Sequence, residues 1–239
     1  MAKMTPEILT EKMLDLCGDN LSSVVLYGSS VAGDKLEGSD YNVLVVLNRL
    51  DAQALQTLTG LCSLWGKEGN PAPLLFAKEA MLRSADVFPV EFSDLIQTHK
   101  VIYGPNPFAG MKIDPAHLRL QLEHELKTKL ILLRGRFLGT KGAAKEVEAL
   151  LTSSISSFLS LFKAILRLYG ENPPAKKMEA LPLLAKHIKI DIEIFTIAWE
   201  LKEGKKRQDL NSVQLFSRYL AAVQYVTDEV DLWLQRAVK

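Results

Sequence analysis

A short segment between two apolar runs carries the residue types that could bind a phosphate and a divalent cation. It extends from Gly28 to Asn42 and reads GSSVAGDKLEGSDYN. Glycine lets a backbone approach a phosphate closely, and the first turn of a helix offers unpaired amide donors to it. Asp40 and Asn42 are two residues apart at the start of the second apolar run, so both side chains should point to one face of a strand. Two carboxylates there would bind a metal ion, but the second side chain is an amide.

The elements that must position this segment are two buried strands. Ser23–Tyr27 (SVVLY) precedes it and Tyr41–Leu47 (YNVLVVL) closes it; both are rich in β-branched residues and bounded by Gly, Ser or Asn. Helical spacing follows in the stretch that contains Leu55, Leu58 and Trp65. Further short strands are predicted over the ranges Pro73–Phe76, Val87–Phe92 and Val101–Tyr103. The first half of the chain is therefore expected to be an α/β (α+β) domain with a mixed sheet flanked by helices.

A break in the pattern divides the chain in two. Gly104–Pro107 stops regular structure, because proline supplies no backbone donor and restricts the residue before it. After it the spacing is helical almost throughout, beginning with Asp114 as a helix cap and Pro115 at the first helical position. We predict one domain over residues 1–110 and an all-α antiparallel helical bundle over residues 111–239.

The spacing of the segment resembles that of nucleotidyltransferases of the DNA polymerase beta superfamily, especially the kanamycin-nucleotidyltransferase-like and minimal forms. Their pattern is a hydrophobic residue, Gly-Ser, then Gly-Asp, then Ser-Asp-x-Asp at the head of a strand. The residues in that register are Tyr27, Gly28, Ser29, Gly33, Asp34, Ser39, Asp40, Tyr41 and Asn42. The resemblance covers about the first 110 residues. The remainder resembles these proteins only in its general helical character.

The resemblance implies a reaction and a set of site residues. Members transfer a nucleotide from a nucleoside triphosphate to a hydroxyl acceptor, with three carboxylates holding two magnesium ions. By this resemblance Gly28 and Ser29 would contact the triphosphate, and the catalytic and metal-binding positions are Asp40, Asn42 and Glu91. Asp94 is the alternative to Glu91 as the third carboxylate.

Asn42 is where the chain departs from the family pattern. An amide oxygen can bind magnesium but brings no negative charge, so magnesium-dependent transfer is expected to be impaired. Asp34, Glu37 or the phosphates of the nucleotide could supply charge nearby. The alternative is a catalytically inactive nucleotide-binding or protein-interaction module, with self-association through the helical half also left open.

Two further groups of residues were considered as sites. Arg119 and His124 have the Arg-x4-His spacing of HEPN ribonucleases, although a salt-bridged solvent-facing helix surface with Glu123 and Lys127 explains them better. His99, His117 and His187 have no carboxylate or cysteine at metal or catalytic spacing, so no site is predicted on them.

Composition bounds the remaining possibilities. The chain has 239 residues, 48% of them hydrophobic, and a formal net charge of +1, which gives no general attraction to nucleic acid or to an anionic membrane. Cys17 and Cys62 have neither metal-ligand spacing nor a disulfide framework. The N-terminus shows no signal peptide, and no apolar stretch is expected to reach the roughly 18 to 20 residues needed to span a bilayer. A soluble cytoplasmic protein is therefore expected.

Overall fold

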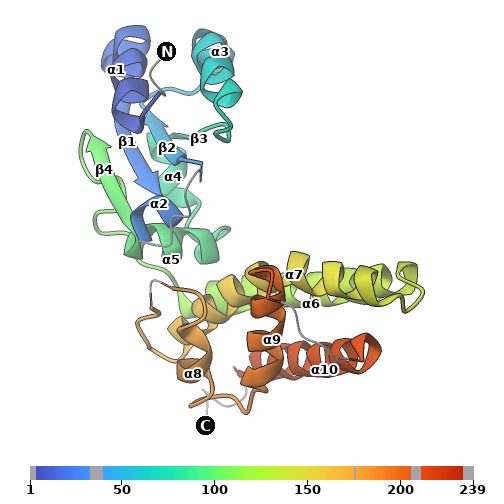
Figure 1. Ribbon diagram of the computed structural model, residues 1–239. Helices are drawn as coiled ribbons and strands as arrows, with labels where there is room; N and C mark the ends of the chain where they lie inside the picture. The colour runs from blue at the N-terminus through green and yellow to red at the C-terminus, as the bar shows by residue number, and fades with distance from the viewer. Residues whose placement is uncertain (1–3, 33–39, 175, 206–210, 234–239) are drawn as a thin grey trace. The chain divides into compact units, whose positions relative to one another are not determined.

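The computed structural model describes residues 4–32, 40–174, 176–205 and 211–233. The chain divides into two compact units, Met1–Ile113 and Asp114–Lys239. We call the first the sheet unit and the second the helical unit, and each is described by itself (Figure 1).

A four-stranded sheet organises the first unit, in the order β3-β2-β1-β4. The interior strand β1 (Leu21–Tyr27) pairs antiparallel with β2 (Asn42–Leu47) and with β4 (His99–Tyr103). The edge strand β3 (Leu74–Ala77) pairs parallel with β2. This mixed sheet with helices confirms the fold class predicted from the sequence.

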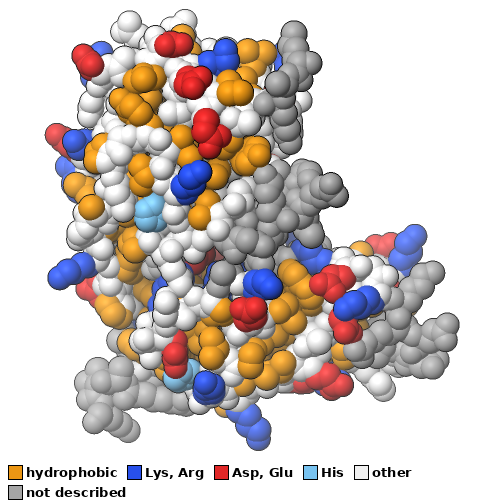
Figure 2. Space-filling model, turned by 60° about the vertical axis from the view of Figure 1, so that its left-hand side comes forward, with side chains coloured by type: hydrophobic (Ala, Val, Ile, Leu, Met, Phe, Trp, Pro, Cys, Tyr) orange, Lys and Arg blue, Asp and Glu red, His pale blue; other side chains and the backbone are white. Residues whose placement is uncertain are grey.

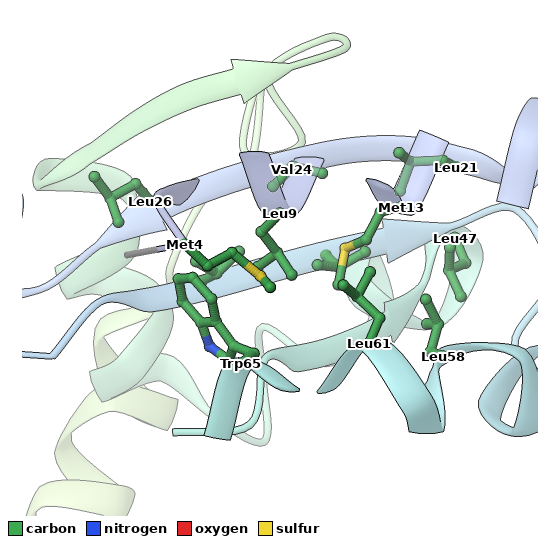
Figure 3. Packing of buried hydrophobic residues seen from close by; sticks show 12 residues of the cluster. Met4, Leu9, Met13, Leu21, Val24, Leu26, Leu47, Leu58, Leu61 and Trp65 are labelled. Carbon is green, nitrogen blue, oxygen red and sulfur yellow. The ribbon is translucent and has the colours of Figure 1, made fainter. Parts of the chain in front are cut away.

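One face of the sheet is covered by α1 (Pro6–Cys17) and α3 (Ala52–Lys67). Each helix begins at a capped residue: Thr5 accepts a hydrogen bond from the amide of Ile8, and Asp51 accepts one from the amide of Ala54. Figure 3 shows how side chains of both helices meet those of the strands, with Trp65 fully buried. The labelled residues are Met4, Leu9, Met13, Leu21, Val24, Leu26, Leu47, Leu58, Leu61 and Trp65.

The other face carries α4 (Lys78–Arg83) and α5 (Pro89–Gln97). Met81 of α4 and Phe92 of α5 are 1% exposed and pack with Val25, Leu44 and Val46 of the sheet. Two shorter elements complete the unit: the 3-10 turn η1 (Gly18–Asn20) before β1 and the helix α2 (Ser29–Ala32) after it.

The predicted strand at Val87–Phe92 is wrong, because this part of the chain forms the start of α5. Pro89 occupies the first helical position, where its missing amide hydrogen costs nothing and its fixed φ favours the helix. The buried residues that follow, Val90, Phe92, Ser93 and Leu95, recur at helical spacing rather than alternating. A proline inside a run otherwise typical of a strand was the signal against that interpretation.

The helical unit is built around α7 (Ala144–Leu168), which packs against the helices α6, α8, α9 and α10. As predicted, Asp114 caps α6, accepting from the amide of Ala116, and Pro115 is its first residue. The bounds of the four surrounding helices are α6 Pro115–Gly139, α8 Ala180–Leu184, α9 Ile192–Lys202 and α10 Ser212–Asp231.

By length and composition α7 could also cross a membrane, with a mean hydropathy of 1.6 over its most apolar window. Its apolar side chains are instead used inside the unit. Phe158, Leu159, Phe162 and Ile165 are each at most 1% exposed. A central helix surrounded by other helices needs apolar residues on several sides, so the hydropathy of α7 is explained by burial in its own unit.

Apolar side chains also gather on the surface of the helical unit, as Figure 2 shows for one face. On α6, Leu120, Ile131 and Leu138 are 58%, 66% and 80% exposed. Their separations of eleven and seven residues are close to three and two helical turns, so the three side chains share one face of the helix.

A close approach at Gly104 holds β4 against the start of β1. Gly104 has φ +75°, and a Cβ there would lie 2.0 Å from the carbonyl oxygen of Ser22. Ser23 Oγ donates to the carbonyl of the next residue, Pro105, at 2.8 Å. We predict that Gly104→Ala lowers the free energy of unfolding by more than about 2 kcal/mol, from left-handed strain and the clash together.

Gly110→Ala is the matched control, because Gly110 has φ +77° but no atom within 4 Å of the added Cβ. It should cost only the backbone strain, about 1 kcal/mol. Urea denaturation of both variants measures the difference, and equal losses would contradict the close approach at Gly104.

Candidate functional site

Three side chains form a row across one end of the sheet. Tyr27, the last residue of β1, pairs with Asn42 at the start of β2 and with His99 at the start of β4. Residues directly opposite each other on antiparallel strands point to the same face, which here is the face covered by α5. The row therefore joins the predicted site residue Asn42 to a histidine 57 positions later in the chain.

Gly28 brings the loop after β1 close to this row. It has φ +80°, and a Cβ at this position would lie 3.3 Å from Nδ2 of Asn42. The amide of Val31 donates to the Gly28 carbonyl at 3.0 Å, and Ser30 Oγ donates to the carbonyl of Asp40 at 3.2 Å. These contacts place the backbone after β1 beside the residues that begin β2.

A buried asparagine fixes the entry to β2. The amide of Tyr41 donates to Oδ1 of Asn70 at 3.0 Å, and Asn70 is 5% exposed. The ring of Tyr41 lies 6.2 Å from that of Trp65, whose indole nitrogen donates to the carbonyl of Pro71 at 2.9 Å. Asp40 is thus attached to a rigid part of the sheet unit while its own side chain stays exposed.

The electrostatics link Asp40 to the same row. The pKa of Tyr27 is raised above its ordinary value, first by burial and second by the negative charge of Asp40. Both causes disfavour the phenolate. The carboxylate of Asp40 therefore lies near Tyr27 and adds negative charge to this end of the sheet.

Solved structures contain the same architecture. The crystal structure of spectinomycin adenyltransferase AAD(9) from Enterococcus faecialis with ATP and spectinomycin matches 93% of this chain and 97% of that chain, with a TM-score of 0.59 and 15% sequence identity. This is the nucleotidyltransferase fold. The resemblance drawn from the segment Gly28–Asn42 is thereby confirmed for the fold, which is what a likeness at this identity shows.

Other comparisons add little to this result. A toxin–antitoxin structure with AMP-PNP matches 43% of this chain and 76% of that chain at 22% identity, but its TM-score of 0.30 is too low to indicate a shared fold. No protein-family model and no curated protein matches the sequence.

Among the described residues, the carboxylates needed for two metal ions are not gathered at this end of the sheet. Leu44 of β2 pairs with Leu74 of β3, so continuing that register back by two residues brings Asn42 level with Ala72, which is flanked by prolines. Among the described residues no group of three or more His, Cys, Asp or Glu side chains could hold a metal ion. Of the predicted metal ligands at this end of the sheet, Asp40 is therefore the one described carboxylate beside Asn42.

The structure places the other predicted site residues as follows. Glu91 lies exposed on the first turn of α5, with Asp94 one turn later, so neither is on a strand. Both belong to the helix that covers the face of the Tyr27 row, yet they form no metal-binding cluster with Asp40. The side chain of Ser29 and the whole of residues 33–39, including Gly33 and Asp34, lie outside the described residues.

The candidate nuclease pair does not form a site. Arg119 donates to Glu123 at 2.5 Å, and Glu123 also accepts from Lys127 at 2.5 Å, while His124 is exposed. The pKa of Glu123 is lowered, chiefly by the hydrogen bond from Lys127. This is the salt-bridged helix surface that the spacing favoured.

His99 is the residue that sequence reasoning missed. It was set aside because no carboxylate or cysteine stands near it in the sequence, but the pairing of β4 with β1 places it beside Tyr27 in the candidate site. The strand predicted over Val101–Tyr103 begins two residues earlier in the structure, at His99, so the prediction came close to this residue without including it. The register that aligns it with Tyr27 could not be read from the sequence.

The link between Tyr27 and Asp40 can be tested directly. Asp40→Asn should lower the pKa of Tyr27 toward its ordinary value, because one of the two causes of its rise is removed. NMR titration of isotope-labelled tyrosine measures the shift. Asp15→Asn, on the exposed side of α1, is the control and should leave Tyr27 unchanged; an unchanged pKa in the Asp40 variant would place Asp40 away from this row.

Proposed function

We propose that the sheet unit binds a nucleoside triphosphate together with magnesium at the end of the sheet formed by Tyr27, Gly28, Asp40 and Asn42. The reaction supported by this fold is transfer of the nucleotide to a hydroxyl acceptor, impaired here because Asn42 stands in place of a carboxylate. The observation that carries the proposal is the approach of Gly28 to Asn42, with Ser30 bonded to the carbonyl of Asp40.

The conformation of Gly28 matters because it keeps the backbone bare. Its positive φ and the closeness of Asn42 favour glycine at this position, and a phosphate can approach a backbone without a side chain. The adenyltransferase of similar fold was solved with ATP, which makes ATP the first nucleotide to test. The acceptor is proposed only as a hydroxyl compound.

Transfer would proceed by attack of the acceptor oxygen on the α-phosphorus. The new P–O bond forms as the bond to pyrophosphate breaks, and the hydroxyl proton leaves to a base. Magnesium, when bound, would neutralise charge on the phosphates. Asp40 would hold it by a carboxylate and Asn42 by its amide oxygen. Positions 40 and 42 would therefore contribute one negative charge where the family pattern supplies two.

The third carboxylate remains a proposal. Glu91 is the first candidate and Asp94 the alternative, because both are carried by α5 on the face of the Tyr27 row. A substitution at each position decides between them.

A second candidate function is that of an interaction module without turnover. The exposed Leu120, Ile131 and Leu138 on α6 favour it, because exposed apolar side chains are enriched where one chain packs against another. Charged side chains lie between them on the same helix face, so such a contact would be partly polar. Nucleotide binding without turnover, together with self-association, would fit this candidate better than a transferase.

Removal of the carboxylate at position 40 tests the proposed site. Asp40→Asn should weaken ATP binding in magnesium by more than about tenfold, because a first metal ligand is lost. Without magnesium the same change should tighten binding slightly, because a negative charge that faces the phosphates is removed. Isothermal titration calorimetry with and without magnesium measures both. Glu91→Gln and Asp94→Asn are run beside it, and the variant that also loses magnesium dependence identifies the third ligand. Unaltered binding in the Asp40 variant would remove this residue from the site.

Restoring charge at position 42 tests the proposed impairment. Asn42→Asp should tighten magnesium-dependent ATP binding by about tenfold, because a carboxylate binds magnesium better than an amide does. Without magnesium the same change should weaken binding, since a second negative charge then faces the phosphates. Asn48→Asp, exposed just beyond the other end of β2, adds an equal charge as the control. Identical responses at the two positions would contradict the proposal.

A further inference from the structure

The end of the sheet contains a polar group that the proposed function does not yet use. Nδ1 of His99 is buried and has no hydrogen-bond partner among the described residues. The residue as a whole is only partly buried. A polar atom buried without a partner is unusual in a native structure and calls for an explanation.

Packing alone does not explain this histidine. Its ring meets Phe108 edge to face, with centroids 4.8 Å apart, and Phe108 belongs to the core cluster on this face of the sheet. A phenylalanine would make the same contact without burying an unpaired nitrogen. The imidazole is therefore retained at a cost to stability, which indicates a role for its other nitrogen.

The contact with Phe108 also determines which ring nitrogen of His99 is available to a ligand. With Nδ1 turned into the protein, Nε2 is the nitrogen left to meet a ligand. A buried N–H without a partner is rarer than an unpaired acceptor, so we assign Nδ1 as the acceptor and Nε2 as the donor. His99 then presents one hydrogen-bond donor.

The position of His99 in the sheet indicates which group that donor would contact. In the sheet, Tyr27 lies between His99 and Asn42, and Gly28 follows Tyr27 directly. The Gly28 backbone, which is proposed to contact the triphosphate, therefore lies between His99 on one side and the Asp40–Asn42 pair on the other. On the Asp40 side a phosphate needs a cation, because the protein supplies negative charge. On the His99 side the protein can supply a donor itself.

We propose that His99 is a nucleotide-binding residue whose Nε2 donates a hydrogen bond to a phosphate oxygen of the bound triphosphate. This inference rests on the proposed function, since it names a further residue of the same site.

The test compares His99→Phe with His99→Gln. The phenylalanine keeps the ring contact with Phe108 and removes both nitrogens, whereas the glutamine amide can restore a donor near the place of Nε2. In magnesium, His99→Phe should bind ATP about tenfold more weakly, and His99→Gln should stay within about threefold of the unaltered protein. Calorimetry with inorganic tripolyphosphate should show the same loss for His99→Phe, because the proposed contact is to phosphate rather than to base or ribose.

Two controls separate binding from folding. The melting temperature of His99→Phe should be unchanged or higher, because the variant no longer buries an unpaired nitrogen. His117→Phe, on the exposed first turn of α6, should bind ATP as the unaltered protein does.

The outcomes keep the two proposals apart. If the unaltered protein binds neither ATP nor tripolyphosphate, both the proposed function and the role of His99 fail. If it binds and His99→Phe binds equally well, only the role of His99 fails. A loss for ATP without a loss for tripolyphosphate would overturn the assignment to phosphate.

Discussion

The pairing of β1 with a strand on each side is the constraint on which the candidate site depends. Tyr27 is held opposite Asn42 by one ladder and opposite His99 by the other. Because side chains directly opposite each other share a face, these two ladders alone bring together residues from three distant parts of the chain. The register is fixed in turn by the two cores, since a slip of one residue would move every apolar side chain to the wrong face.

The balance of charge at this end of the sheet follows from one position. Asp40 contributes a carboxylate near Tyr27, and Asn42 contributes none. A nucleoside triphosphate would meet one negative side chain rather than two at positions 40 and 42. Less positive charge would then be needed to offset the repulsion between its phosphates and the protein. Under the proposed function, the same amide would lower the affinity for the magnesium that catalysis by two metal ions requires. The amide would then favour nucleotide binding without magnesium and disfavour it with magnesium, so binding and catalysis would be separable.

Local sequence patterns were sufficient to predict part of this structure. The strands β1 and β2, the glycine between them and the capped start of α6 follow from β-branched runs, from Gly28 and from Asp114-Pro115. The start of α5 was misread as a strand because Val87, Val90 and Phe92 suggested one, although Pro89 argued for a helix start. The role of His99 could not be predicted for a different reason. Its place beside Tyr27 depends on a pairing between residues 72 positions apart, which no local spacing encodes.

The support beneath Asp40 explains how the site can keep its shape whatever stands at position 42. The amide of Tyr41 is held by buried Asn70, and Tyr41 packs near the fully buried Trp65, so the entry to β2 is fixed by the core rather than by a bound metal. Two carboxylates at positions 40 and 42 would repel each other whenever no cation lay between them. An amide at position 42 removes that repulsion, and Gly28 lies close to it. Under the proposed function, the same amide that would weaken magnesium-dependent transfer would also make this end of the sheet easier to assemble before a cation binds.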